Sequence, residues 1–185
     1  MMGMKSEESF LLGIKPALIT TDHYEFISHL KTNYPYYVLQ KRESFSDYLF
    51  FQDKEKMHSF LNQVNGTSDS QNPKHIQALG ICLGFPPEAV HYFLIAGSRM
   101  YERVGLHYMG IHCAGSIDKL INNVLWLWNK YPFPELDKLQ VIYEVGSIRQ
   151  EIQLDYEDRN SLQLFHRVLL NSMNLMKTYE NSLES

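Results

Sequence analysis

The sequence predicts a single α+β domain, in which helices pack on a mostly antiparallel sheet built from hairpins. Residues 36–52 and 139–156 each have a hairpin pattern, because two runs rich in β-branched and aromatic residues flank a short turn. Amphipathic helical patterns lie between the hairpins, without the regular alternation that a parallel sheet requires. We expect residues 1–9 to fray and residues 10–182 to form the domain.

Length and composition agree with one globular domain. The chain has 185 residues, of which 44% are hydrophobic and 21% charged. A globule of this length buries roughly 70% of the surface that its unfolded chain exposes. The longest apolar runs are far shorter than the roughly 20 residues that cross a bilayer, so we expect no membrane span.

The N-terminal elements follow from apolar spacing and from capping residues. The first is an apolar run over residues 10–14, which is either a strand or the start of a helix. A helix follows that is capped by Thr20 or Thr21 and stops at Asn33 and Pro35. After the first hairpin comes a helix over residues 54–64, which ends at Asn65-Gly66. The polar residues 67–72 are expected to form a surface loop.

A proline-bounded segment, Pro73 to Gly97, has the pattern of two helices joined by a turn at Gly84-Phe85-Pro86. This pattern is similar to a DNA-binding helix-turn-helix. However, a recognition helix presents donors to bases and phosphates, and the second helix has no Lys or Arg before Arg99. The net charge of −4 and the pI near 6.0 also disfavour nucleic acid, so a transcriptional regulator is only an alternative.

The C-terminal half is expected to begin with one strand and to end with a long helix. The expected elements are a strand over residues 103–114, a helix over residues 117–130 capped by Ser116, the second hairpin around Gly146-Ser147, and a helix over residues 160–179. Gly105 and Gly110 permit bulges in the strand.

His107, His112 and Cys113 are the candidate catalytic residues, since imidazole and thiolate serve both as metal ligands and as a base with its nucleophile. On one continuous strand, His107 and His112 point to opposite faces unless a glycine bulge intervenes, and no CxxC or HExxH motif completes a zinc site. We therefore assign no metal. Cys113 near the helix start at Ser116 is the better candidate for a lowered thiol pKa, which keeps a small thiol- or metal-based enzyme as an alternative.

The leading interpretation is a small module that binds a small molecule or a protein. Polar groups interrupt the apolar pattern at Lys15, Arg99 and Tyr101, which are the candidate ligand-binding residues beside the two histidines. No motif indicates a cofactor. Two cysteines without a pairing framework and a start unlike a secretory signal predict a cytoplasmic protein.

Three stretches carry a family resemblance: Gly13-Ile14-Lys15-Pro16-Ala17, the run from Leu79 to Pro86 followed by Glu88-Ala89-Val90, and the strand-to-helix stretch after Tyr101. Together they resemble an uncharacterised bacterial family catalogued as domain of unknown function 3793, over roughly residues 10 to 130. The resemblance implies a bacterial protein. It implies no activity, because that family has none established.

Overall fold

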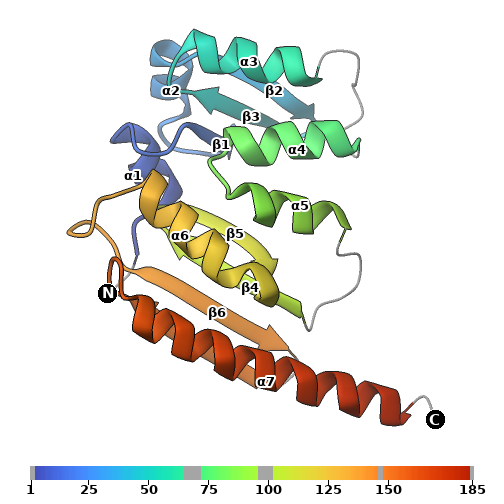
Figure 1. Ribbon diagram of the computed structural model, residues 1–185. Coiled ribbons are helices and arrows are strands. Elements are labelled where there is room, and N and C mark those ends of the chain that lie inside the picture. The colour runs from blue at the N-terminus through green and yellow to red at the C-terminus, as the bar shows by residue number, and fades with distance from the viewer. Residues whose placement is uncertain (1–2, 65–71, 96–101, 146–147, 184–185) are drawn as a thin grey trace. The chain divides into compact units, whose positions relative to one another are not determined.

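The computed structural model describes residues 3–64, 72–95, 102–145 and 148–183. The chain divides into two compact units, an N-terminal unit of Lys5–Gly84 and a C-terminal unit of Phe85–Ser185 together with Met1–Met4 (Figure 1). Each unit has its own antiparallel sheet and its own helices, which confirms the predicted α+β class. Among the described helices, none combines the length and the apolar character that a membrane span needs.

The N-terminal unit is a three-stranded sheet with helices on both faces. Its strands are β1 (Ala17–Thr21), β2 (Tyr36–Lys41) and β3 (Ser46–Phe51), in the order β1-β3-β2, and its helices are α1 (Ser6–Leu11), α2 (Ile27–Asn33), α3 (Lys54–Val64) and α4 (Pro73–Cys82). Phe10 of α1 and Leu30 of α2 form a buried cluster with Phe50 of β3 on one face. On the other face, Phe60 of α3 contacts Phe51 of β3.

Two predictions for this unit are wrong, and both concern short elements. Thr20 and Thr21 lie in β1 instead of capping a helix, because the apolar residues from Ala17 onward pair with β3. Residues 6–9 lie in α1 and Ser9 is buried, so this part of the chain is not frayed. The hairpin β2–β3 and the helices α3 and α4 are confirmed, and Asn72 caps α4 by accepting a hydrogen bond from the backbone N–H of Lys74.

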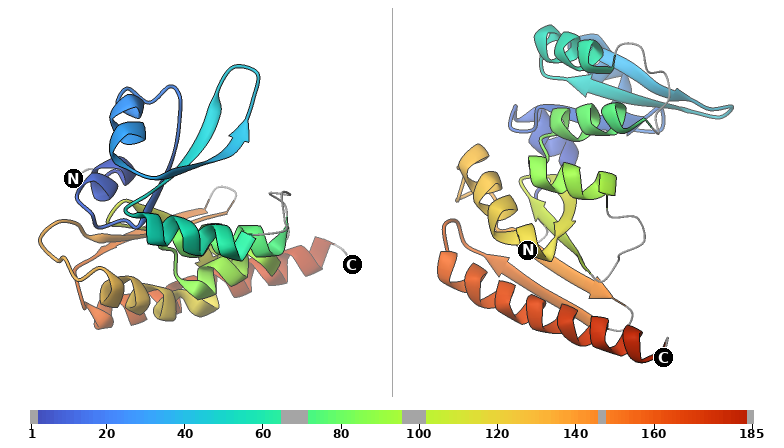
Figure 2. Two further views of the ribbon diagram at one scale, coloured as in Figure 1. Left: turned by 90° about the horizontal axis from the view of Figure 1, so that it is seen from above. Right: turned by 45° about the vertical axis from the view of Figure 1, so that its right-hand side comes forward.

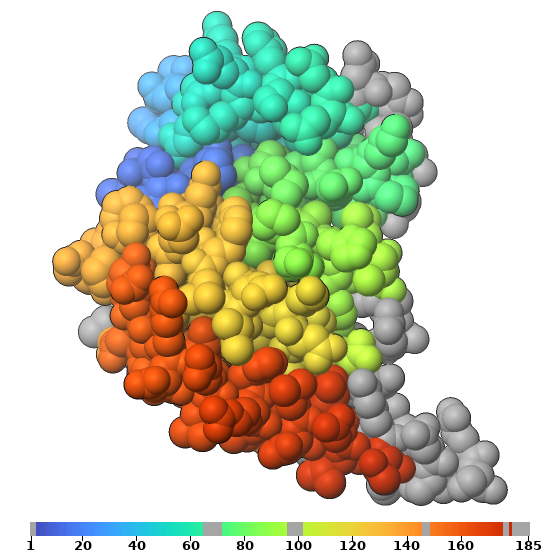
Figure 3. Space-filling view, in the orientation of Figure 1, coloured from blue at the N-terminus to red at the C-terminus, as the bar shows by residue number. Residues whose placement is uncertain are grey.

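The C-terminal unit is a four-stranded sheet with helices packed on one face. Its strands are β4 (Arg103–Tyr108), β5 (Ile111–Ser116), β6 (Leu139–Val145) and β7 (Ile148–Leu154), in the order β5-β4-β6-β7. Its helices are α5 (Pro87–Ile95), the 3-10 turn η2 (Ile117–Lys119), α6 (Leu120–Lys130) and α7 (Arg159–Leu183). In Figure 2 (left), α5, α6 and α7 lie together on one side of these strands, and Figure 3 shows the side chains of α6 and α7 as a continuous layer.

Alternation along the strands explains why the helices cover one face of this sheet. Alternate side chains on β4 and β6 are fully buried, and they are Val104, Leu106, Tyr108, Leu139, Val141 and Tyr143. Val124 and Leu127 of α6 and Leu162 and Leu169 of α7 are buried in the same core. Each such side chain contributes about 2 kcal/mol through burial. The side chains between them point to the opposite face.

The strand predicted over residues 103–114 is two strands. The chain reverses at Met109-Gly110, and both residues have positive φ values, 53° and 70°. A two-residue turn of this kind matches the right-handed twist of the strands that it joins. The sequence lacks the usual Asn-Gly or Asp-Gly signature here, so the turn was not predicted. Its consequence is that residues five apart in sequence become cross-strand neighbours.

Candidate binding site

The β4–β5 hairpin places His107 directly opposite His112. Their imidazole rings are stacked, with centroids 4.4 Å apart and planes inclined by 12°. His112 is exposed and His107 is half-buried, so solvent reaches the pair. The prediction that they point to opposite faces holds only for a continuous strand, and the turn at Met109-Gly110 overturns it.

Cys113 does not join the two histidines. It lies opposite Leu106, a residue that is fully buried on the helix-covered face of the sheet. Since successive side chains of a strand point to opposite faces, the thiol and the imidazoles are separated by the sheet. Burial raises the pKa of the Cys113 thiol to about 12, which is the reverse of the lowered pKa expected from the sequence.

The helix-free face of this sheet has a polar row beside a row of small and apolar residues that ends in Glu151, and we call it the open face. The polar row crosses all four strands as His112, His107, Gln140 and Gln153, each opposite the next. The adjacent row is Ala114, Gly105, Ile142 and Glu151. None of these eight residues is buried. The open face is therefore accessible along its whole width and has small residues beside the imidazole pair.

Gly105 and Ala114 make a low point in the open face. They are cross-strand partners, and a Cβ on Gly105 would lie 3.6 Å from the backbone oxygen of Ile142. That distance is an ordinary van der Waals contact, so the position has room for the Cβ of an alanine. The low point next to the histidines therefore exists because Gly105 and Ala114 have little or no side chain, and not because the backbone excludes a Cβ there.

Ionic side chains hold the β6–β7 side of the open face. Arg149 donates to Glu144 at 2.9 Å and to Glu151 at 2.8 Å, and Gln140 also donates to Glu151. These bonds, first from Arg149 and then from Gln140, lower the pKa of the Glu151 carboxyl, and the charge of His107 adds to the effect. Glu151 is therefore a fixed negative charge near the imidazole pair.

Two hydrogen bonds hold the end of the hairpin that carries the pair. The backbone N–H of Met109 donates to the Asp137 carboxylate at 2.8 Å. The Tyr108 hydroxyl donates to the backbone oxygen of Tyr131 at 2.9 Å. Both partners lie in the segment between α6 and β6. The position of His107 relative to His112 thus depends on contacts made outside the hairpin.

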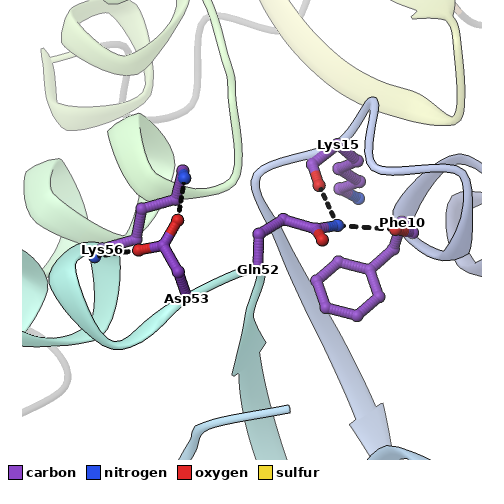
Figure 4. Close-up of polar contacts among 5 residues, drawn as sticks. All are labelled: Phe10, Lys15, Gln52, Asp53 and Lys56. Carbon is purple, nitrogen blue, oxygen red and sulfur yellow. Dashed lines mark hydrogen bonds and ion pairs between the residues drawn. The ribbon is translucent and has the colours of Figure 1, made fainter. Parts of the chain in front are cut away.

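Lys15 lies in the N-terminal unit, just after α1. Its side chain is buried, and its ammonium group donates to the Ser6 hydroxyl. Burial lowers the pKa of Lys15 to about 8, although Glu7 opposes this shift. Gln52 fixes the backbone there, because its amide donates to the carbonyl oxygens of Phe10 and Lys15 (Figure 4).

Two of the predicted ligand-binding residues are outside the part of the chain that the structure describes. Arg99 and Tyr101 lie outside the described residues. Within the described ranges, no three His, Cys, Asp or Glu side chains are grouped closely enough to hold a metal ion. The candidate site is therefore the open face with its imidazole pair.

No family model, curated protein or solved structure matches this chain. The assignment of a site consequently depends on its geometry. Sequence reasoning named both histidines but missed Gln140 and Glu151, which come from the second hairpin. The only signal for them was the alternation of polar and apolar residues along residues 139–154, and that alternation gives no order of strands.

Proposed function

We propose that this protein is a binding module that receives a small, polar, planar ligand on the open face of its C-terminal sheet. The observation that carries this proposal is the stacked pair of His107 and His112, accessible on a face that no helix of its unit covers. Stacked aromatic rings on an exposed surface are available to stack on or bond to a ligand. A cytoplasmic location is part of the proposal, since Cys82 and Cys113 are both free thiols.

The residues around the pair supply both polarity and shape. Gln140, the residue opposite His107, provides an amide donor and acceptor, and the low point at Gly105 and Ala114 leaves room for a flat ring. In a site of this kind, a few polar side chains fix the orientation of a ligand that rests on an apolar surface. It favours a planar ligand over a bulky one.

The alternatives receive less support. A thiol enzyme needs a thiolate beside its base, whereas Cys113 has a pKa of about 12 and lies on the other face of the sheet. A DNA-binding regulator needs cations on its recognition helix, and Glu88 is the one charged residue of α5. Membership of the resembled bacterial family is compatible with a binding module and is part of our proposal.

The test is to map where small ligands bind. A fragment set of planar polar heterocycles is added to the ¹⁵N-labelled full-length chain, and backbone amide shifts are followed. We expect the shifts to centre on Gly105, His107 and Ala114. Shifts centred around Lys15 would contradict the proposal and place the site in the N-terminal unit.

A pair of variants sharpens this experiment. Ala114→Leu fills the low point of the open face, and Gln153→Leu introduces the same side chain at an exposed position on the far edge of that face. We expect fragment binding to weaken by at least tenfold in Ala114→Leu and to change little in Gln153→Leu. Equal binding by both variants would exclude the low point as the ligand site.

A further inference from the structure

We infer that the His107–His112 pair is a chelating site for a divalent transition-metal ion. This inference rests on the proposed function, because it names the ligand class of the same open face. The two imidazoles are held side by side by the β4–β5 pairing, with ring centroids 4.4 Å apart. Imidazole nitrogens are preferred ligands of Zn²⁺, Cu²⁺ and Ni²⁺.

The cross-strand spacing of the pair allows two neighbouring coordination positions once the rings turn. A metal–nitrogen bond of about 2 Å at a right-angled pair of positions requires the two nitrogens to be about 3 Å apart. The nitrogen lone pairs lie in the ring planes, so rings stacked at 4.4 Å must turn out of the stack about their side-chain torsions to share one ion. Because the hairpin already sets the distance between the two backbones, little further ordering is needed when an ion binds.

The charges near the pair favour a cation. Gln140 lies opposite His107 and donates a hydrogen bond to the Glu151 carboxylate, which also accepts one from Arg149. Arg149 is itself occupied by Glu144 and Glu151. A negative charge fixed beside an imidazole stabilises an ion bound there.

The donor set also predicts which ions bind. No group of three His, Cys, Asp or Glu side chains occurs among the described residues, so the pair supplies two donors and the other positions are left to water or to a bound molecule. For two imidazole donors, the general order of affinity places Cu²⁺ above Ni²⁺ and Zn²⁺. The open positions would let a planar ligand with a nitrogen or oxygen donor bind through the metal.

The experiment is calorimetric titration of the full-length chain with Cu²⁺, Ni²⁺ and Zn²⁺. We expect one ion to bind through the pair, with Cu²⁺ the tightest, and His107→Ala and His112→Ala each to weaken that binding about 100-fold, because a chelate becomes a single donor. The matched control is His91→Ala, which removes an exposed imidazole from α5. Histidine ring shifts measured by NMR should move for His107 and His112 alone.

Two results would overturn the inference. One is wild-type affinity in His112→Ala, a variant at an exposed position that should fold normally. The other is an equal loss of affinity in His91→Ala. If fragments still map to the open face, only the metal inference fails. If neither metal nor fragments report on the open face, the proposed function fails as well.

Discussion

The carboxylate of Asp137 accepts a hydrogen bond of 2.8 Å from the backbone N–H of Met109, and that residue has a φ of 53°. A non-glycine residue with positive φ is strained, and this bond offsets part of the strain. Asp137 therefore supports the imidazole pair indirectly, because it stabilises the Met109-Gly110 turn, and this turn sets which residues of β4 and β5 face each other.

Replacing Asp137 should weaken this turn. We expect Asp137→Ala to lower the free energy of unfolding by about 1–2 kcal/mol, since the Met109 N–H loses a partly buried acceptor. Asp137→Asn retains one acceptor oxygen and should lose less. Urea denaturation followed by circular dichroism measures both values. An Ala variant as stable as the wild type would show that the bond does not support the turn.

Gly115 and Asn123 should be energetically coupled. A Cβ added to Gly115 would lie 2.5 Å from the side-chain nitrogen of Asn123, a buried residue of α6. We expect Gly115→Ala to destabilise the protein by about 1–3 kcal/mol through overpacking.

A double-mutant cycle tests this coupling. Within the described residues, the Asn123 amide has no hydrogen-bond partner, so Asn123→Ala removes the obstacle without breaking such a bond. The double variant should then recover much of the loss, with a coupling energy of about 0.5–3 kcal/mol. Additive effects in thermal unfolding would contradict the predicted contact.

Lys15 should make stability depend on pH in the alkaline range. Its pKa is about 8 in the folded chain, below the ordinary lysine value of 10.5, so the unfolded state binds more protons between these values. The contribution of Lys15 to the free energy of unfolding therefore rises with pH across that window, by up to about 3 kcal/mol.

Lys15→Met isolates this effect, because methionine fills similar space without a charge. We expect Lys15→Met to be more stable than the wild type at pH 7.5 and to lose that advantage as the pH approaches 10.5. Contributions from other groups cancel in the difference between the two proteins. Lys56→Met, at an exposed lysine of α3, is the control. A difference that stays constant with pH would exclude a lowered pKa for Lys15.

Both cysteines should be unreactive in the folded protein. Burial raises the pKa of Cys82 and of Cys113 to about 12, from an ordinary thiol value of 9.0. At pH 8 the thiolate fraction should then be about 1,000-fold lower than in the unfolded chain. Iodoacetamide labelling followed by mass spectrometry, with and without guanidinium, measures the ratio. Rapid labelling of Cys113 in the native state would restore the thiol-enzyme alternative.

The parts of the fold that sequence could predict are those with strong periodicity. The helices over residues 54–64 and 73–82 were predicted with the bounds or caps that the structure has, as was the pairing of β6 with β7. These elements depend on apolar spacing and capping, which are local properties. The predicted helix cap at Thr20 or Thr21 was wrong because the capping propensity of threonine is local, whereas both residues pair with β3, which is a tertiary contact.

The sequence predicted two residues of the candidate site but not the contact between them. His107 and His112 were named, yet their contact depends on a turn formed by Met109, a residue rare at positive φ. Gln140 and Glu151 join them through strand order, which a single sequence does not encode locally. Arg99 and Tyr101 stay predictions, since they lie outside the described ranges.

The two-residue turn at Met109-Gly110 also determines which side chain of β5, an imidazole or a thiol, lies opposite His107 on the open face. A shift of β5 by one residue against β4 would bring Cys113 opposite His107 and turn His112 toward the helices, because a strand presents alternate residues to each face. The borderline imidazole pair would become an imidazole–thiolate pair, which favours softer ions. A single insertion or deletion in this hairpin would therefore exchange an imidazole for a thiol on the open face, and would change which ions the proposed site prefers.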